Sequence, residues 1–166
     1  MPTQPDLIPG LAAQPAPWPT AHLRVVRIGE PLPPERIDEP IQSHGYWFRH
    51  VAAHPFFDSA KEHLAVILLN TKLATIGWNL VAIGSLNEAI AHPREIFRPA
   101  VAAAAYGFVL MHNHPSGDST PSDADRRLTS RLAEGGTLLQ IRMLDHVIVG
   151  AAPSDRPFSF RESGLL

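Results

Sequence analysis

Two histidines separated by one residue carry the strongest chemical signal in the chain. His112 and His114 follow Tyr106–Met111, a short apolar run rich in residues that favour strands. Alternate side chains of an extended chain share a face, so both imidazoles are expected to point the same way. Imidazole nitrogens are common zinc ligands. The pair therefore predicts a metal site at the end of a strand.

A carboxylate follows the pair at a spacing that a turn can close. Pro115 and Gly117 predict this turn, and a helix is expected to begin near Ser122. Asp125 then lies in the first turn of the helix, where it is expected to supply a third ligand from the opposite side. Two histidines and one carboxylate leave tetrahedral Zn²⁺ one open position, which is typical of catalytic rather than structural zinc.

The same spacing also fits an ordinary helix start. Ser122-x-x-Asp125 is close to a capping box, with Asp in place of the usual Glu or Gln, and an acidic residue there favours the helix dipole. A chance pairing of histidines is a further alternative in a chain that contains nine of them. The spacing alone leaves both metal binding and helix capping open.

Longer stretches resemble a known family. The motif H-x-H-P-x6-S-x-x-D, which begins at His112, is similar to the JAB/MPN metalloprotease signature. Its surroundings resemble the bacterial RadC-like branch of that superfamily. The similar stretches are Gly84–Val101, His112–Asp125, Leu144–Gly150 and the C-terminal FSFRESGLL. The resemblance covers roughly residues 61–166.

The resemblance implies a particular chemistry. His112, His114 and Asp125 would bind Zn²⁺, and Ser122 would assist at the oxyanion. The implied function is a zinc-dependent hydrolase that cleaves a peptide or isopeptide bond in a peptide or protein substrate. The implied fold is a three-layer α/β (α+β) sandwich with a mixed, mainly antiparallel sheet flanked by helices.

One position departs from the family pattern. The family has a glutamate five residues before the glycine of the GSLN-like segment, and this glutamate takes a proton from the attacking water. Counting back from Gly84 gives Asn79, whose neighbours are not acidic. An amide cannot accept and return a proton at neutral pH. The alternative function is therefore a zinc-holding but catalytically weak binding or scaffold module. Glu88 is the preferred surrogate base, with Glu95 as a second candidate.

The order of predicted elements independently favours an α/β sandwich with a mixed sheet. Strands are expected at residues 23–28, 62–70, 73–83, 106–111, 140–149 and 158–160, and helices at residues 41–53, 93–104 and 122–134. Gly135-Gly136 is expected to end the last helix. Residues 1–20 are proline-rich and predict a flexible tail, with the RadC-like domain over residues 21–166.

Other polar residues are ambiguous. His44, His50 and His54 are expected to be solvated or packed, because no carboxylate has ligand spacing to them. Asp145 and His146 are candidates for groups that orient a metal ligand.

Composition narrows the partners and the location. A net charge of −2 predicts weak binding to nucleic acid, so a DNA-repair role, which RadC-like proteins have long been assigned, is a lesser alternative. We also expect the chain to lack the helix-hairpin-helix region that precedes this domain in longer RadC-like proteins. No apolar run is long enough to cross a membrane, and the sequence contains no cysteine. The N-terminal residues lack a basic and an apolar region, so we expect no signal peptide. We expect a cytoplasmic protein.

Overall fold

The computed structural model describes residues 32–84 and 91–166. The predicted tail at residues 1–20 and the predicted strand at residues 23–28 lie outside these ranges. Within the described residues, every helix is too short or too polar to cross a membrane.

The described residues form a central five-stranded sheet, in the order β2-β1-β3-β4-β5. β1 (Glu62–Leu69) pairs antiparallel with both β2 (Thr75–Gly84) and β3 (Gly107–Asn113). β4 (Arg142–Val149) runs parallel to β3, and β5 (Phe158–Ser159) returns antiparallel to β4. The sheet is therefore mixed and mainly antiparallel, as predicted.

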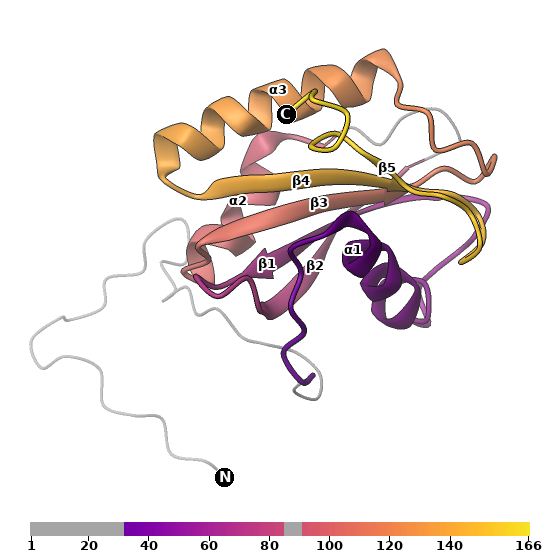
Figure 1. Ribbon diagram of the computed structural model, residues 1–166, viewed down its shortest axis with the longest axis horizontal. Coiled ribbons are helices and arrows are strands. Elements are labelled where there is room, and N and C mark those ends of the chain that lie inside the picture. Colours follow the sequence, from indigo (N-terminus) through magenta and orange to yellow (C-terminus); the bar gives the residue numbers. More distant parts are fainter. Residues whose placement is uncertain (1–31, 85–90) are drawn as a thin grey trace, which may run out of the picture.

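Helices cover both faces of the sheet (Figure 1). The helical elements are α1 (Pro40–Tyr46), a π-helical turn (Trp47–Val51), α2 (Pro93–Ala102) and α3 (Asp123–Leu139). β1 is buried almost throughout, and its alternate side chains enter two cores. Leu64 and Val66 pack in the core that holds residues of α2 and α3, whereas Ala65 and Ile67 pack with residues of α1 and the π-helical turn. This arrangement confirms the predicted α/β sandwich.

The predicted end of the last helix is wrong. α3 continues past Gly135-Gly136 to Leu139, and Gln140 forms its cap in the left-handed conformation. The two glycines instead permit close approach. A Cβ at Gly135 would lie 2.9 Å from the Phe97 ring, and one at Gly136 would lie 2.6 Å from the carbonyl oxygen of Ile141. Tertiary contacts, rather than helix termination, account for both residues.

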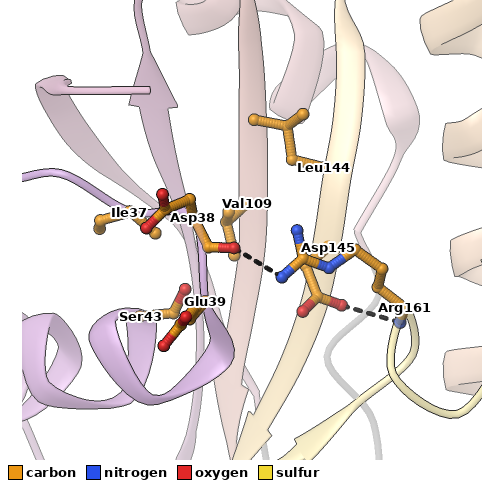
Figure 2. Close-up of a pocket in the computed structure, with 8 residues that line it drawn as sticks. All are labelled: Ile37, Asp38, Glu39, Ser43, Val109, Leu144, Asp145 and Arg161. Atoms are coloured by element: carbon orange, nitrogen blue, oxygen red, sulfur yellow. Dashed lines mark hydrogen bonds between the residues drawn. The ribbon is translucent and has the colours of Figure 1, made fainter. Parts of the chain in front are cut away.

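The C-terminal segment is fastened to the α1 face of the sheet (Figure 2). Asp145 on β4 accepts hydrogen bonds from Ser159 Oγ at 2.6 Å and from the backbone N–H of Arg161 at 3.0 Å. The Arg161 guanidinium donates to the carbonyl oxygen of Asp38 at 2.7 Å. These bonds tie β4, the C-terminal segment and the residues before α1 together around a small cavity.

Candidate metal centre

The two histidines lie at the C-terminal end of β3, a central strand of the sheet. His112 is buried and pairs with Leu64 of β1, so it faces α2 and α3. His114 follows directly after β3 and is half-buried. Between them, Asn113 accepts a hydrogen bond from the backbone N–H of His63 at 2.8 Å and donates to the carbonyl oxygen of Lys61 at 2.9 Å. Asn113 thus fastens the end of β3 to the start of β1.

The loop after β3 orients the second histidine. His114 Nδ1 lies 2.7 Å from the carbonyl oxygen of Asp118. A carbonyl can only accept, so Nδ1 carries the hydrogen, and in the neutral ring Nε2 keeps its lone pair. Gly117 supports this turn with a φ of 86°, a left-handed conformation that favours glycine. The predicted turn therefore orients His114 so that Nε2 faces His112 and Asp125.

α3 supplies the carboxylate, and its first turn is a capping box as predicted. The Asp125 N–H donates to Ser122 Oγ at 3.2 Å, while the Ser122 N–H and hydroxyl donate to Asp125 Oδ2 at 2.8 and 2.6 Å. Helix capping and metal binding are compatible interpretations of this motif, because the same carboxylate also lies beside the histidines. Asp125 Oδ1 is 3.3 Å from His112 Nε2, and Oδ2 is 3.8 Å from His114 Nε2.

The three predicted ligands converge on one point. His112 Nε2 and His114 Nε2 are 3.0 Å apart, and one ligand atom from each of His112, His114 and Asp125 lies within 4.8 Å of the others. Residues 32–84 and 91–166 contain no second group of this kind, and His50 instead pairs with Glu35 at 2.6 Å. Two imidazoles and a carboxylate at this separation suit a metal that takes nitrogen and oxygen ligands.

The surroundings favour the neutral form of His112. Burial is the main cause that lowers the pKa of His112 to about 4; Asp125 opposes the shift, and His114 adds to it. Burial also holds the pKa of His146 well below its ordinary value. Neutral imidazole is the form that ligates metals, so the low-dielectric interior keeps His112 in the ligating form around neutral pH.

The residues predicted to supply a base are placed less completely. Asn79 is an exposed residue of β2 that pairs with Val66, and this register points its side chain to the sheet face that carries His112. Glu88 lies outside the described residues. Glu95 forms ion pairs at 3.3 Å with Arg94 and Arg98 on its own helix.

Sequence reasoning missed one residue and grouped another wrongly. Thr129 on α3 and His146 on β4 contact each other at 2.7 Å, and His146 contacts His112 at 2.9 Å. The spacing Asp125-x-x-x-Thr129 is one helical turn and was a usable signal for Thr129. Asp145, paired with His146 in the sequence analysis as a candidate to orient a ligand, instead bonds to the C-terminal segment.

Comparison with known proteins identifies the family. A family model described as RadC-like JAB domain matches residues 43–165. The chain belongs to this family. It is 50% identical over 109 residues to a UPF0758 protein of Pelodictyon phaeoclathratiforme, covering 66% of this chain and 48% of that protein. A UPF0758 protein of Thermotoga maritima is 41% identical over 132 residues, or 80% of this chain and 57% of that protein.

The RadC-like domain thus spans about half the length of these curated relatives. Their names state no activity, substrate or partner. Family membership therefore supports the JAB-type fold, while the metal centre and the reaction have to be argued from the residues of the site.

Proposed function

We propose that this RadC-like domain is a zinc-dependent hydrolase of peptide or isopeptide bonds, with His112, His114 and Asp125 as the zinc ligands. The observation that carries the proposal is the convergence of three ligand atoms within 4.8 Å, two of them imidazole nitrogens 3.0 Å apart. When bound, Zn²⁺ lowers the pKa of a coordinated water and polarises a carbonyl oxygen. Two histidines and one carboxylate leave a position open for that chemistry.

Ser122 has a proposed role at the oxyanion. Its hydroxyl is exposed and adjacent to the centre, where it donates to Asp125 Oδ2 at 2.6 Å. To serve a substrate, this hydroxyl would turn from Asp125 to the developing negative charge. A single donor at an oxyanion contributes about 2.7–4 kcal/mol where it has been removed in other enzymes.

Asn79 sets the expected rate. We assign it to the position at which the resemblance implies a glutamate, and its pairing with Val66 points it to the sheet face that carries His112. Its amide can orient a water by hydrogen bonding but cannot take its proton. We therefore propose a slow hydrolase, and Asn79 is also the observation that favours the second candidate, a zinc-holding binding or scaffold module. The charge of −2 gives DNA binding no comparable support.

Zinc content tests the ligand assignment. The purified protein should hold one zinc per chain, and His114→Ala should hold far less because one nitrogen ligand is gone. His54→Ala is the matched control, since His54 is exposed and lies outside the cluster. Equal zinc in wild type and His114→Ala would reject the assignment.

Hydrolysis rates at matched zinc content separate the two candidates. The wild type should cleave model isopeptides slowly, and Asn79→Glu should raise the rate by roughly 10²–10⁴-fold, the usual contribution of general-base catalysis. Glu95→Gln should change little, because Glu95 is paired with arginines. If the wild type is active and Glu88→Gln abolishes that activity, the base would be assigned to Glu88. Inactivity of wild type and Asn79→Glu alike would favour the binding module.

A further inference from the structure

Two buried polar residues lie directly behind His112. Thr129 and His146 are 1% and 0% exposed. His112 Nδ1 is 2.9 Å from His146 Nε2, and His146 Nδ1 is 2.7 Å from Thr129 Oγ1. The Phe160 ring stacks on His146 with centroids 4.7 Å apart and an interplanar angle of 10°. The His146 ring is therefore held at both nitrogens and on one face.

The hydroxyl of Thr129 sets the direction of these hydrogen bonds. It donates its single hydrogen to the carbonyl oxygen of Asp125 at 2.7 Å. It is then left to accept from His146, so the His146 hydrogen lies on Nδ1. In a neutral ring His146 Nε2 has a lone pair, which accepts from His112 Nδ1. His112 Nε2 consequently faces His114 and Asp125 without a hydrogen.

We propose that Thr129 and His146 are positioning residues that hold His112 in the Nδ1–H tautomer and so keep Nε2 available for a metal. The opposite tautomer would place a hydrogen on Nε2, which lies 3.0 Å from His114 Nε2 and 3.3 Å from Asp125 Oδ1. That hydrogen would bond to these two groups and block the ligand atom. The metal-binding part of this inference rests on the proposed function, whereas the tautomer is a property of the metal-free chain.

Local structure brings the two positioning residues to this place. The register between β3 and β4 shifts between Phe108 and Val109, leaving Leu144 as an extra residue in β4. Beyond this bulge, His146 pairs with Leu110 and faces α3. Thr129 lies one helical turn after Asp125, on the buried side of α3. The hydrogen bonds therefore run from the backbone of one candidate ligand to the ring of another, across β4.

Nitrogen NMR spectra of the histidine rings test the tautomer without metal. The spectra are recorded at about pH 8, above the ordinary histidine pKa of about 6.5. Wild type and His146→Gln should both show His112 as Nδ1–H, because the glutamine carbonyl can accept from His112 and its amide can donate to Thr129. His146→Leu removes the acceptor and should shift His112 to Nε2–H. An Nε2–H tautomer in wild type would overturn the inference.

Zinc affinity, measured by competition with a chelator, tests the consequence. His146→Leu should weaken zinc binding by roughly 10–100-fold, the usual effect of removing a group that orients a metal ligand. Thr129→Val should weaken it less, while Thr129→Ser and His146→Gln should stay close to wild type. Thr137→Val is the matched control, because Thr137 makes the same backbone hydrogen bond on α3, to the carbonyl oxygen of Ala133 at 3.0 Å.

Two outcomes separate the failure of this inference from the failure of the proposed function. A folded His146→Leu with wild-type tautomer and wild-type zinc affinity would overturn the inference alone. A wild type that takes up no zinc would reject the proposed function, while the metal-free spectra would still decide the tautomer. If His146→Leu does not fold, Thr129→Val against Thr129→Ser carries the same test, and equal spectra and affinities for that pair would overturn the inference.

Discussion

Asp145 and His146 are neighbours on β4, both buried, and their side chains serve opposite faces of the sheet. Asp145 pairs with Val109 and faces α1, and its carboxylate accepts from the backbone N–H of Arg161 (Figure 2) and from the hydroxyl of Ser159. His146 faces α3 and lies between Thr129 and His112. Two of the groups that donate to Asp145, Ser159 and the Arg161 N–H, belong to the segment it fastens, and a third is the backbone N–H of His146. The partners of the His146 ring lead instead to the candidate metal ligands.

Two buried polar residues on the same strand therefore have different roles. Burial alone does not distinguish the two, since Asp145 is 3% exposed and His146 is 0% exposed. The groups at which their hydrogen bonds end distinguish the two residues. A path that closes within the fold indicates stability, while a path that ends on convergent lone pairs indicates binding. Substituting Asp145 should therefore change the free energy of unfolding, and substituting His146 should change the metal affinity.

Removing Asp145 should give the largest change in stability. Asp145→Ala leaves the Ser159 hydroxyl and the backbone N–H groups of Arg161 and His146 without this acceptor. Losing these charge-assisted bonds should lower the free energy of unfolding by about 3 kcal/mol, measured by urea denaturation of the metal-free protein. Glu134→Ala, at an exposed position on α3, should stay within about 0.5 kcal/mol. The zinc affinity of folded Asp145→Ala should match that of wild type. A large loss of affinity would contradict the separate roles of Asp145 and His146.

Zinc should stabilise the protein through the other face. At a free zinc concentration about 100 times the Kd, the free energy of unfolding should rise by about 2.7 kcal/mol in wild type and in Asp145→Asn. It should not rise in His114→Ala, which lacks a ligand. The metal-free wild type should still unfold cooperatively, because the two apolar cores do not depend on the metal. Loss of cooperative unfolding on chelation would contradict this expectation.

Acidity should act on Asp145 with a definite sign. Burial raises its pKa, and the hydrogen bonds from Ser159 and the Arg161 backbone only partly oppose this. The folded protein then holds a proton more readily than the unfolded chain. Stability conferred by this group is full below the unfolded pKa, about 3.9, and is lost as pH rises through the folded pKa.

Asp145→Asn isolates this effect because the amide does not ionise. The free energy of unfolding of Asp145→Asn minus that of wild type should increase as pH rises from about 4 toward neutral, by about 1.4 kcal/mol for each unit of pKa difference. Denaturation of both proteins across this range gives the difference directly. A difference independent of pH would show that Asp145 titrates normally despite its burial.

The ligands were predictable from the sequence because they lie close together in it. His112, His114 and Asp125 span one strand end, one turn and one helix start, and local rules describe all three. Their support was not predictable in the same way. His146 reaches His112 through parallel pairing of β3 and β4 and a bulge at Leu144, and neither feature has a local signal.

The same limit explains the wrong helix end. Gly135-Gly136 is a good stop signal when read locally, but Phe97 of α2 and the carbonyl oxygen of Ile141 occupy the space that side chains there would need. Conversely, Gln140 has no sequence feature of a helix end, yet it adopts the left-handed cap. The α/β sandwich, by contrast, was predictable from the order of the elements and from apolar runs such as residues 65–69, which one buried strand satisfies.

The smallest expected effect lies at this far end of α3. Gln140 has a φ of 57° and a ψ of 32°, and its N–H caps the carbonyl oxygens of Gly136 and Thr137. A Cβ is unfavourable in this conformation, so Gln140→Gly should raise the free energy of unfolding by about 0.5–1 kcal/mol, after the greater freedom of glycine in the unfolded chain is subtracted.

Gln140→Ala is the matched control, because alanine keeps the Cβ and should gain nothing. Thermal or urea denaturation of the three proteins measures the difference, and equal stability of the glycine and alanine variants would contradict the strain argument. Zinc affinity should be the same in all three, since Asp125 and Thr129 lie at the opposite end of the helix. A change in zinc affinity on Gln140→Gly would mean that α3 transmits its C-terminal conformation to the ligands. Stability and metal binding would then be coupled along α3, and the separation drawn between Asp145 and His146 would hold for β4 alone.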